Sequence, residues 1–309
     1  MKTLMTVFLG LLIAPFGAPA NPPPVDLDAF DAGMKSAALP NGITLAYADL
    51  GPRDGIPVVL IHGFTNNARN WAPLLPYLDP HLRLILVDAR GHGRSSRPEC
   101  CYTRLDMAYD VKLLLDHLHV ESAHIVGHSM GSIITQMFAE TWPQRTRNVV
   151  LIGSSGGSRP ECGTPTSPLG GMREALLHMQ DPIDPHSKFM NDWYGNANAP
   201  EPDVTRRQRR DAAAIPVRVW LALIDQGFTG LDLQATLPRL TAPTLLIWGD
   251  KDALISEPAR CALRKGLPTA KVHVFPDYGH NPYWDDPAAV AAVVNPFLLE
   301  AAPASPSAR

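Results

Sequence analysis

The sequence lacks a surplus of charge of either sign. Its 309 residues include 27 Lys and Arg against 30 Asp and Glu, which gives a formal net charge of -3 at pH 7. A chain without a basic excess has no extended cationic surface for nucleic acid, so we expect no nucleic-acid partner. One basic cluster stands out, the run Arg206-Arg207-Gln208-Arg209-Arg210. We interpret it as a solvated helix face or loop rather than as a site for a polyanion.

Cysteine is scarce, and its spacing excludes the usual zinc motifs. The four cysteines are Cys100, Cys101, Cys162 and Cys261, without a C-x-x-C pair, and the 11 histidines are scattered. We therefore expect no metal, and no motif predicts an organic cofactor. Four cysteines allow three pairings, which sequence does not distinguish. Adjacent cysteines fit disulfide geometry poorly. Because the adjacent pair and Cys162 both follow predicted strand ends on one sheet edge, we expect a bridge between them.

A hydrophobic run long enough to cross a bilayer comfortably is also missing. The best candidate covers residues 4–16, follows Lys2, and precedes the small residues Ala18-Pro19-Ala20. This pattern predicts a secretory signal peptide over residues 1–20, with an uncleaved anchor as the alternative. We expect export to a periplasm or the medium, no stable membrane insertion after cleavage, and an environment that permits disulfides. No cysteine near the cleavage point indicates lipid attachment.

Short apolar runs alternate with segments of helical spacing through most of the chain. A Gly-containing alternating segment at 39–50 predicts a hairpin strand. Continuous apolar runs predict buried strands at residues 57–61, 82–88, 123–126, 148–152, 244–248 and 271–275. Helices are predicted at residues 71–78, 109–119, 133–142 and 287–299. Strands that alternate with helices indicate an α/β protein with a parallel sheet and right-handed crossovers.

The alternation stops after Gly153, which suggests an insertion into one large domain. Residues 154–240 contain no buried strand but two short helical segments, 172–179 and 217–224. We predict a helical cap there, between a first core part at 21–153 and a second at 241–300. The tail at 301–309 is rich in Pro, Ala and Ser, and we expect it to fray. We find no internal repeat.

One stretch carries a chemical signature, Gly127-His128-Ser129-Met130-Gly131. It lies between a predicted strand and an amphipathic helix, so Ser129 is expected at the apex of a sharp, strained turn. This is the context in which G-x-S-x-G forms a nucleophile elbow. The five residues alone also occur by chance, and the alternative is an ordinary strand-to-helix turn.

A serine hydroxyl needs a base, and the base needs a carboxylate that fixes its tautomer. Open α/β sheets place such groups on loops at the carboxyl ends of strands. His280 follows the last predicted strand and is the candidate base. Asp252 follows the strand at 244–248 and is the candidate acid. Asp250, nearer the strand end, and Asp225, in the cap, are the alternatives.

Three further histidines lie near the predicted site in sequence. His128 adjoins the serine, but we expect residues beside the nucleophile to point away from the base. His62 and His92 lie in glycine-containing turns, where we expect an imidazole to order loop backbone rather than transfer protons.

Acyl transfer also requires two donors for the oxyanion of the tetrahedral intermediate. The backbone N–H of Met130, directly after the serine, is the first candidate. The second is the N–H of Phe64 in His62-Gly63-Phe64, where Gly63 permits close approach of the backbone.

The chain resembles the capped, esterase-like branch of the α/β-hydrolase superfamily from about residue 39 to 299. The matching motifs are His62-Gly63-Phe64, residues 88–95, 127–131 and 249–252, and Gly279-His280-Asn281-Pro282. The resemblance implies a mostly parallel eight-stranded sheet flanked by helices, with an inserted helical cap. It also implies Ser129 as nucleophile, His280 as base, Asp252 as acid, and Phe64 and Met130 as oxyanion donors. Dehalogenases and epoxide hydrolases of this superfamily use an aspartate nucleophile, so Ser129 argues against both.

The resulting expectation is a secreted serine hydrolase that cleaves a small-molecule carboxylic ester or lactone through an acyl-enzyme. The alternatives on the same residues are a C–C bond hydrolase, a cofactor-free haloperoxidase or perhydrolase, and a binding protein that has lost turnover. A pocket lined by apolar residues of the cap would suit a compact apolar acyl or alcohol group. The cap residues that we expect either in the pocket or in the cap core are Met172, Leu176, Leu177, Met179, Phe189, Trp193, Tyr194, Trp220 and Phe228.

Overall fold

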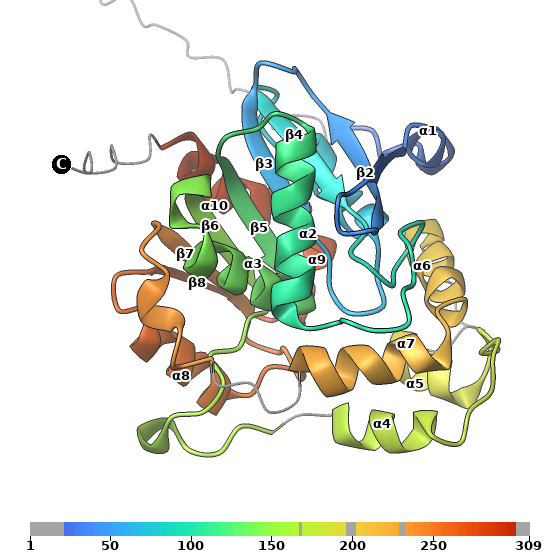
Figure 1. Ribbon diagram of the computed structural model, residues 1–309. Coiled ribbons are helices and arrows are strands. Elements are labelled where there is room, and N and C mark those ends of the chain that lie inside the picture. Colours follow the sequence, from blue (N-terminus) through green and yellow to red (C-terminus); the bar gives the residue numbers. More distant parts are fainter. Residues whose placement is uncertain (1–21, 167–168, 196–201, 229–232, 301–309) are drawn as a thin grey trace, which may run out of the picture.

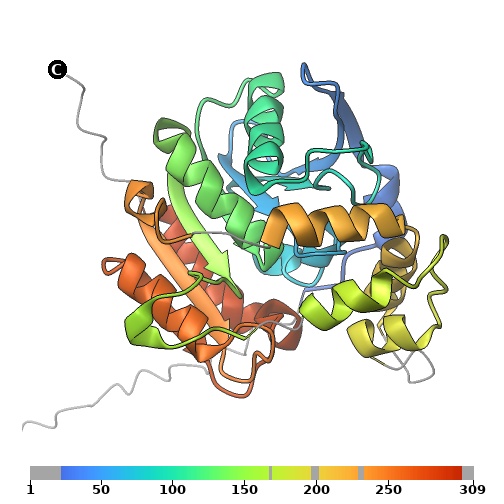
Figure 2. The ribbon, with the colours of Figure 1, turned by 60° about the horizontal axis from the view of Figure 1, so that its bottom comes forward.

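The computed structural model describes residues 22–166, 169–195, 202–228 and 233–300. The predicted signal peptide and tail lie outside these ranges. An eight-stranded sheet forms the centre, with helices on both faces and the helices of the cap gathered at one end of the strands (Figures 1 and 2). The structure thus confirms the predicted fold class.

The sheet is antiparallel at one side and parallel across the rest. Its strand order is β1-β2-β4-β3-β5-β6-β7-β8, and only the pairs β1–β2 and β2–β4 are antiparallel. The strands are β1 (Lys35–Ala38), β2 (Thr44–Leu50), β3 (Ile56–Ile61), β4 (Leu82–Val87), β5 (Ala123–His128), β6 (Thr146–Ile152), β7 (Thr244–Gly249) and β8 (Lys271–Phe275). The carboxyl ends of β3 to β8 therefore meet at one edge.

Successive residues of the parallel strands point to opposite faces and enter two separate cores. Val59 and Ile61 of β3 face α2 and α3, whereas Val58 and Leu60 face α10. A third core lies between β6, β7, α3 and α8. The helices outside the cap are α1 (Leu27–Ala32), α2 (Arg104–His117), α3 (Met130–Thr141), α8 (Glu257–Gly266), α9 (Pro282–Asp285) and α10 (Pro287–Leu299). Because both faces of the central strands β3 to β7 are covered, these strands are largely apolar, as their sequences predicted.

The prediction of a helix at residues 71–78 is wrong. This segment contains two short 3₁₀ turns instead, η1 (Ala68–Trp71) and η2 (Leu75–Tyr77). Pro73 and Pro76 interrupt it, and a proline ring in a helix interior removes one backbone donor and clashes with the preceding turn. Other such turns are η3 (Pro143–Arg145), η4 (Pro160–Cys162) and η6 (Leu237–Arg239).

The cap is richer in helix than the sequence predicted. It contains α4 (Leu169–Leu176), α5 (Lys188–Tyr194), α6 (Asp203–Ala213), α7 (Val217–Ala222) and the π-helix η5 (Leu223–Phe228). The basic run lies in α6, where Arg209 is buried and donates to the carbonyls of Met190 and Gly195. The prediction of a solvated face is therefore wrong for Arg209.

Both disulfides differ from the expected bridge. Cys100 is bonded to Cys101, and Cys162 is bonded to Cys261 with their Cα atoms 5.7 Å apart. The second bridge forms because the chain after β6 runs directly over α8. A Cβ atom on Gly156 would lie only 2.2 Å from the backbone N of Leu263. This contact brings Cys162 in η4 onto α8, whereas Tyr102, next to Cys101, donates its N–H to the side chain of Gln226 in the cap.

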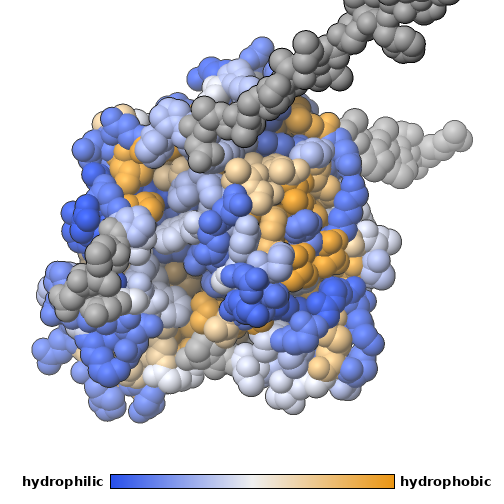
Figure 3. Space-filling model, turned by 180° about the vertical axis from the view of Figure 1, so that it is seen from behind, coloured by the Kyte–Doolittle hydropathy of each residue, from blue (hydrophilic) through white to orange (hydrophobic). Residues whose placement is uncertain are grey.

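The surface of the described residues is mixed in polarity. Figure 3 shows the molecule from behind, with hydrophobic residues in several patches on a largely hydrophilic face. Val272 and Val274 of the edge strand β8 are 46% and 44% exposed. In the part of the chain that the structure describes, no helix is both long and apolar enough to span a membrane.

His124 of β5 gives the fold a predicted acid sensitivity. The side chain is buried, its Nδ1 accepts the N–H of Asn148, and burial lowers its pKa to about 4. The unfolded chain binds a proton near pH 6.5, whereas the folded chain does so only near pH 4. Stability therefore falls as pH decreases through this window.

Between pH 7 and pH 5 the free energy of unfolding should fall by about 2 kcal/mol less in His124→Asn than in the unsubstituted protein. The amide oxygen of asparagine can replace Nδ1 as acceptor, but it binds no proton in this pH range. Urea unfolding at the two pH values measures this difference. His178→Asn is the control, because that side chain is 78% exposed. An equal loss in His124→Asn and the unsubstituted protein would contradict the prediction.

Candidate active site

Ser129 occupies a strained turn between β5 and α3. Its backbone angles are φ 52° and ψ −118°, which non-glycine residues rarely adopt. Close packing enforces the turn. A Cβ on Gly127 would lie 2.2 Å from the carbonyl oxygen of Gly131, and one on Gly131 would lie 2.1 Å from that of Ile61. Both glycines are thus required, because any side chain would separate α3 from β3 and β5.

The loops after β7 and β8 bring Asp252 and His280 together. Asp252 Oδ2 lies 2.9 Å from His280 Nδ1, and the Asp252 side chain is fully buried. The backbone N–H groups of Leu254 and Ile255 donate to Asp252 Oδ1 at 2.8 and 3.1 Å. Asp250, the alternative acid, instead accepts the N–H of Asp277 and so closes the loop after β8. Asp225 pairs with Arg173 within the cap.

The surroundings of Asp252 favour its ionised form. Burial raises the pKa of this carboxyl, but the hydrogen bond and charge of His280, with the N–H groups of Leu254 and Ile255, outweigh it. The net pKa lies below the ordinary value. Because a carboxylate only accepts, Nδ1 of His280 carries the hydrogen, which leaves the Nε2 lone pair available. Nε2 is buried and has no partner among the described residues.

His128 lies against the candidate base, contrary to the expectation that it points away. Its ring centroid is 4.8 Å from that of His280, and its Nε2 lies 3.0 Å from the His280 carbonyl oxygen. A carbonyl only accepts, so His128 donates from Nε2. Burial lowers the pKa of His128 to about 3, so it stays neutral. It therefore positions the backbone of His280 without adding charge.

His62 and His92 order the adjacent loops, in agreement with expectation. His62 Nε2 accepts the N–H of Ala89 at 3.0 Å, and His92 Nδ1 lies 3.0 Å from the carbonyl of Arg90. Burial lowers the pKa of both imidazoles, that of His92 to about 4. The neutral His62 ring thus joins the loop after β3 to the loop after β4, and the neutral His92 ring orders the latter loop.

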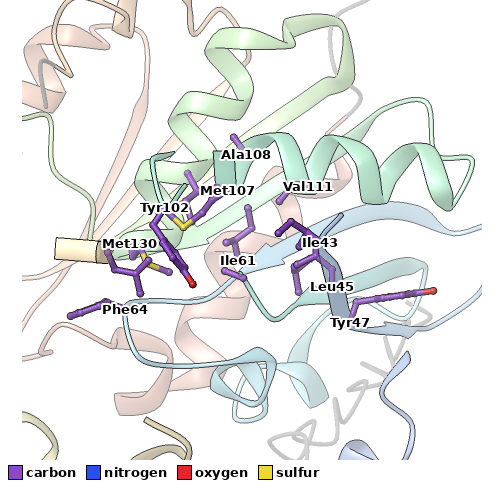
Figure 4. Close-up of a cluster of buried hydrophobic side chains, with 14 of the residues drawn as sticks. Ile43, Leu45, Tyr47, Ile61, Phe64, Tyr102, Met107, Ala108, Val111 and Met130 are labelled. Atoms are coloured by element: carbon purple, nitrogen blue, oxygen red, sulfur yellow. The ribbon is translucent and has the colours of Figure 1, made fainter. Parts of the chain in front are cut away.

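Phe64 and Met130, the candidate oxyanion donors, meet beside the serine. Their side chains lie next to each other at the end of the hydrophobic core (Figure 4), and both residues line the same cavity as Ser129. Met130 is the first residue of α3, so its N–H has no acceptor within the helix.

Ser129 lines two cavities. One has a volume of about 200 Å³ and is largely apolar, and the other has a volume of about 250 Å³ and includes polar groups. Phe64, Trp193 and Leu254 line both cavities and form the boundary between them. The first extends between α3, the loop after β7 and the cap, and is also lined by Ile133, Ser155, Gly157, Leu169, Phe228, Leu233 and Ile255. The second is also lined by Asn66, His128, Asp192, Tyr194, Thr205, His280 and Trp284.

The predicted pocket residues divide into two groups. Trp193 and Phe228 line the first cavity, and Trp193 and Tyr194 line the second. Met172, Leu176 and Trp220 line neither, because they pack into the core beneath the cap; the Trp220 ring lies 5.2 Å from that of Phe64. Leu177 is exposed, and Met179 and Phe189 pack against the core.

Leu233, Leu254 and Ile255 were not predicted. The position of Leu254 and Ile255 two and three residues after Asp252 was a usable signal, but nothing local distinguishes Leu233. Among the described residues, no group of three or more His, Cys, Asp or Glu is arranged to hold a metal.

The strain at Ser129 predicts a difference in stability between Ser129→Gly and Ser129→Ala, which both lack Oγ. Glycine adopts the backbone angles of residue 129 without steric cost, whereas alanine retains a Cβ. We expect Ser129→Gly to have a free energy of unfolding about 1 kcal/mol higher than Ser129→Ala. Chemical denaturation measures it, and equal or reversed stabilities would show that the turn is unstrained.

Comparison with known proteins identifies the family. Residues 56–287 match the family described as alpha/beta hydrolase fold. A 2-hydroxy-6-oxononadienedioate/2-hydroxy-6-oxononatrienedioate hydrolase of Pseudomonas putida is 30% identical over 267 residues, which cover 83% of this chain and 92% of that protein.

Two solved structures are also similar. The structure of a hydrolase from Pseudomonas aeruginosa PA01 has a TM-score of 0.74 and 28% identity, with coverage of 86% of this chain and 98% of that one. The N-acyl homoserine lactone degrading enzyme Est816 has a TM-score of 0.64 and 25% identity, with coverage of 83% and 98%. The serine turn, the strand order and these matches lead to one conclusion: the chain belongs to the alpha/beta hydrolase family and is a hydrolase.

Proposed function

We propose that this protein is a serine hydrolase that cleaves an uncharged carboxylic ester or lactone through an acyl-enzyme. The observation that carries the proposal is the position of Ser129 at the boundary of two cavities, one apolar and one partly polar. An ester has two parts on either side of its carbonyl carbon. Two cavities that share the serine can hold the acyl part and the alcohol part separately.

We propose the following proton transfers, which the hydrogen bond between Asp252 and His280 supports. His280 Nε2 takes the hydroxyl proton of Ser129 as Oγ attacks the carbonyl carbon. The carbonyl oxygen becomes an oxyanion, which the N–H groups of Phe64 and Met130 stabilise. Asp252 stabilises the imidazolium, which then protonates the departing alcohol oxygen. Water attacks the acyl-enzyme by the same route and releases the acid, so that Ser129 regains its proton.

The charges around Ser129 favour a neutral substrate. The described walls of the two cavities include no lysine or arginine, and their acidic residue is Asp192 in the second. The Pseudomonas putida relative is named for a dienedioate, which carries two carboxylates. A buried carboxylate without a cationic partner costs several kcal/mol, so such a dianion fits poorly here. This favours ester or lactone cleavage over the C–C bond hydrolysis of a dicarboxylate.

We predict hydrolysis of p-nitrophenyl esters with an optimum at short to medium acyl chains, because the apolar cavity is only about 200 Å³. Ser129→Ala should lower kcat by at least about 10⁴-fold, since the hydroxyl is the nucleophile. Steady-state kinetics on an acyl-length series, with a dienedioate in parallel, measures both effects. Retained turnover in Ser129→Ala, or a preference for the dienedioate, would contradict the proposal.

Leu233 closes part of the apolar cavity, so its size should limit the acyl chain. The side chain is buried and lies against Gly157, where an added Cβ would be 3.4 Å from Leu233 Cβ. We predict that Leu233→Ala shifts the optimum to acyl chains longer by about two to three carbons. Leu176→Ala is the matched control, because Leu176 is equally buried in the cap but lines neither cavity. A shift common to both variants would mean general loosening of the cap.

We also propose that the mature protein is exported and begins near Asn21. The support is the sequence of residues 1–20, together with the two disulfides, which persist in oxidising compartments. N-terminal sequencing of protein from periplasmic or culture fractions should find a start at or near Asn21. A start at Met1 would refute cleavage.

A further inference from the structure

A third cavity, of about 230 Å³, lies apart from Ser129 and shares no residue with the two cavities described above. It forms where α1, η1, the loop after β4 and the cap helix α6 come together. Figure 1 shows α1 and α6 close to each other at one side of the molecule, and Arg207 of α6 binds Asp28 of α1. The cavity thus spans a junction between cap and core.

The walls of this cavity carry an unusual concentration of charge. Four arginines line it, and three aspartates accompany them. Arg69 is buried and forms ion pairs with both Asp31 and Asp211. Asp31 also pairs with Arg207 from outside the cavity. Two of the three carboxylates are therefore already matched by cations.

The third carboxylate, that of Asp88, accepts hydrogen bonds from two backbone N–H groups. Asp88 Oδ1 accepts the N–H of Ala68 at 2.7 Å, and Oδ2 accepts the N–H of Arg94 at 2.8 Å. Burial raises the pKa of Asp88, while these two hydrogen bonds and the charges of Arg69 and Arg94 act in the opposite direction. Asp88 thus secures the loop after β4 to η1 and makes no ion pair with an arginine in the described structure.

The remaining arginines, Arg94, Arg97 and Arg210, form no ion pair with a carboxylate among the described residues, although the charge of Arg94 acts on Asp88. The Arg94 side chain donates to the backbone carbonyl of Asp31, and that of Arg97 donates to the carbonyl of Gly93 at 2.9 Å. Nε of Arg97 is buried and has no partner. Arg210 lies on the exposed side of α6 at the rim of the cavity. Among the described residues no carboxylate forms an ion pair with these three guanidinium groups, so they retain N–H donors for an anion that enters the cavity.

We propose that this cavity binds a phosphate-type oxyanion, with Arg94, Arg97 and Arg210 as its ligands. Guanidinium groups match the oxygens of phosphate with paired N–H donors. A cavity of about 230 Å³ accommodates inorganic phosphate or the phosphate of a small monoester or lipid headgroup. Part of the basic run therefore has a ligand-binding role, which its sequence did not indicate. The bound anion connects the cap, through Arg210, to the core loop that holds Arg94 and Arg97.

Thermal unfolding of the full-length mature protein tests the site. Sodium phosphate replaces sodium chloride at constant ionic strength, so that screening stays fixed. We expect a saturable rise in Tm with Kd in the millimolar range or below. Arg97→Gln and Arg210→Gln should each weaken Kd at least about tenfold. Arg206→Gln is the matched control, because Arg206 lies on the same helix, pairs with Asp203 and does not line the cavity.

Vesicles distinguish the source of the phosphate. Co-sedimentation with phosphatidylglycerol vesicles, with and without competing inorganic phosphate, follows the same four proteins. Retention of the unsubstituted protein and Arg206→Gln, but not of Arg97→Gln or Arg210→Gln, would support the proposal with a lipid headgroup as ligand. No saturable effect in either assay, or an equal effect in all four proteins, would overturn it.

Discussion

The contact of α3 with β3 and β5 is the constraint on which the rest of the site depends. Gly131 lies against the carbonyl of Ile61, and Gly127 lies against that of Gly131, at distances that no Cβ tolerates. This packing forces Ser129 into its strained backbone and fixes it at the carboxyl edge of the sheet. The loops after β3, β7 and β8 end at the same edge, so Phe64, Asp252 and His280 arrive there without further structure. The strain is compatible with a stable protein because apolar cores on both faces hold the sheet in place.

Few charged side chains surround Ser129 at this edge of the sheet. The histidines that support the loops, His62, His92 and His128, all have pKa values lowered by burial. They order backbone without placing positive charge beside the base. Asp252, whose pKa lies below its ordinary value, supplies a fixed negative charge where an imidazolium would form. The cavity walls add no described cation, which suits a substrate without charge. Cationic side chains gather instead around the separate cavity between α1 and α6.

Local signals predicted much of this architecture. Buried strands appear as continuous apolar runs, and G-x-S-x-G between a strand and a helix specifies the turn at Ser129. The order of the strands then placed His280 and Asp252 at the correct edge, where the structure joins them by a hydrogen bond. Pro73 and Pro76 are local signals in the sequence against the helix predicted at 71–78.

Features that depend on contacts between distant segments were not predictable. The Cys162–Cys261 bridge requires the passage of the chain over α8, and Leu233 reaches the cavity only through the path of the cap. The contact of His128 with His280 depends on the packing of the end of β5 against a loop 152 residues away in the sequence. α6 contains few large apolar side chains, and its contacts with other segments include the ion pair of Arg207 with Asp28 and the hydrogen bonds of the buried Arg209.

The most direct test of the central claim is the reaction of the protein with a fluorophosphonate, followed by mass spectrometry of the labelled peptide. We expect a single adduct, on Ser129. The rate of labelling should fall by at least about 10²-fold in His280→Gln, because general-base assistance is lost. An adduct on another residue, or labelling of Ser129 that is indifferent to His280, would contradict the assignment of nucleophile and base.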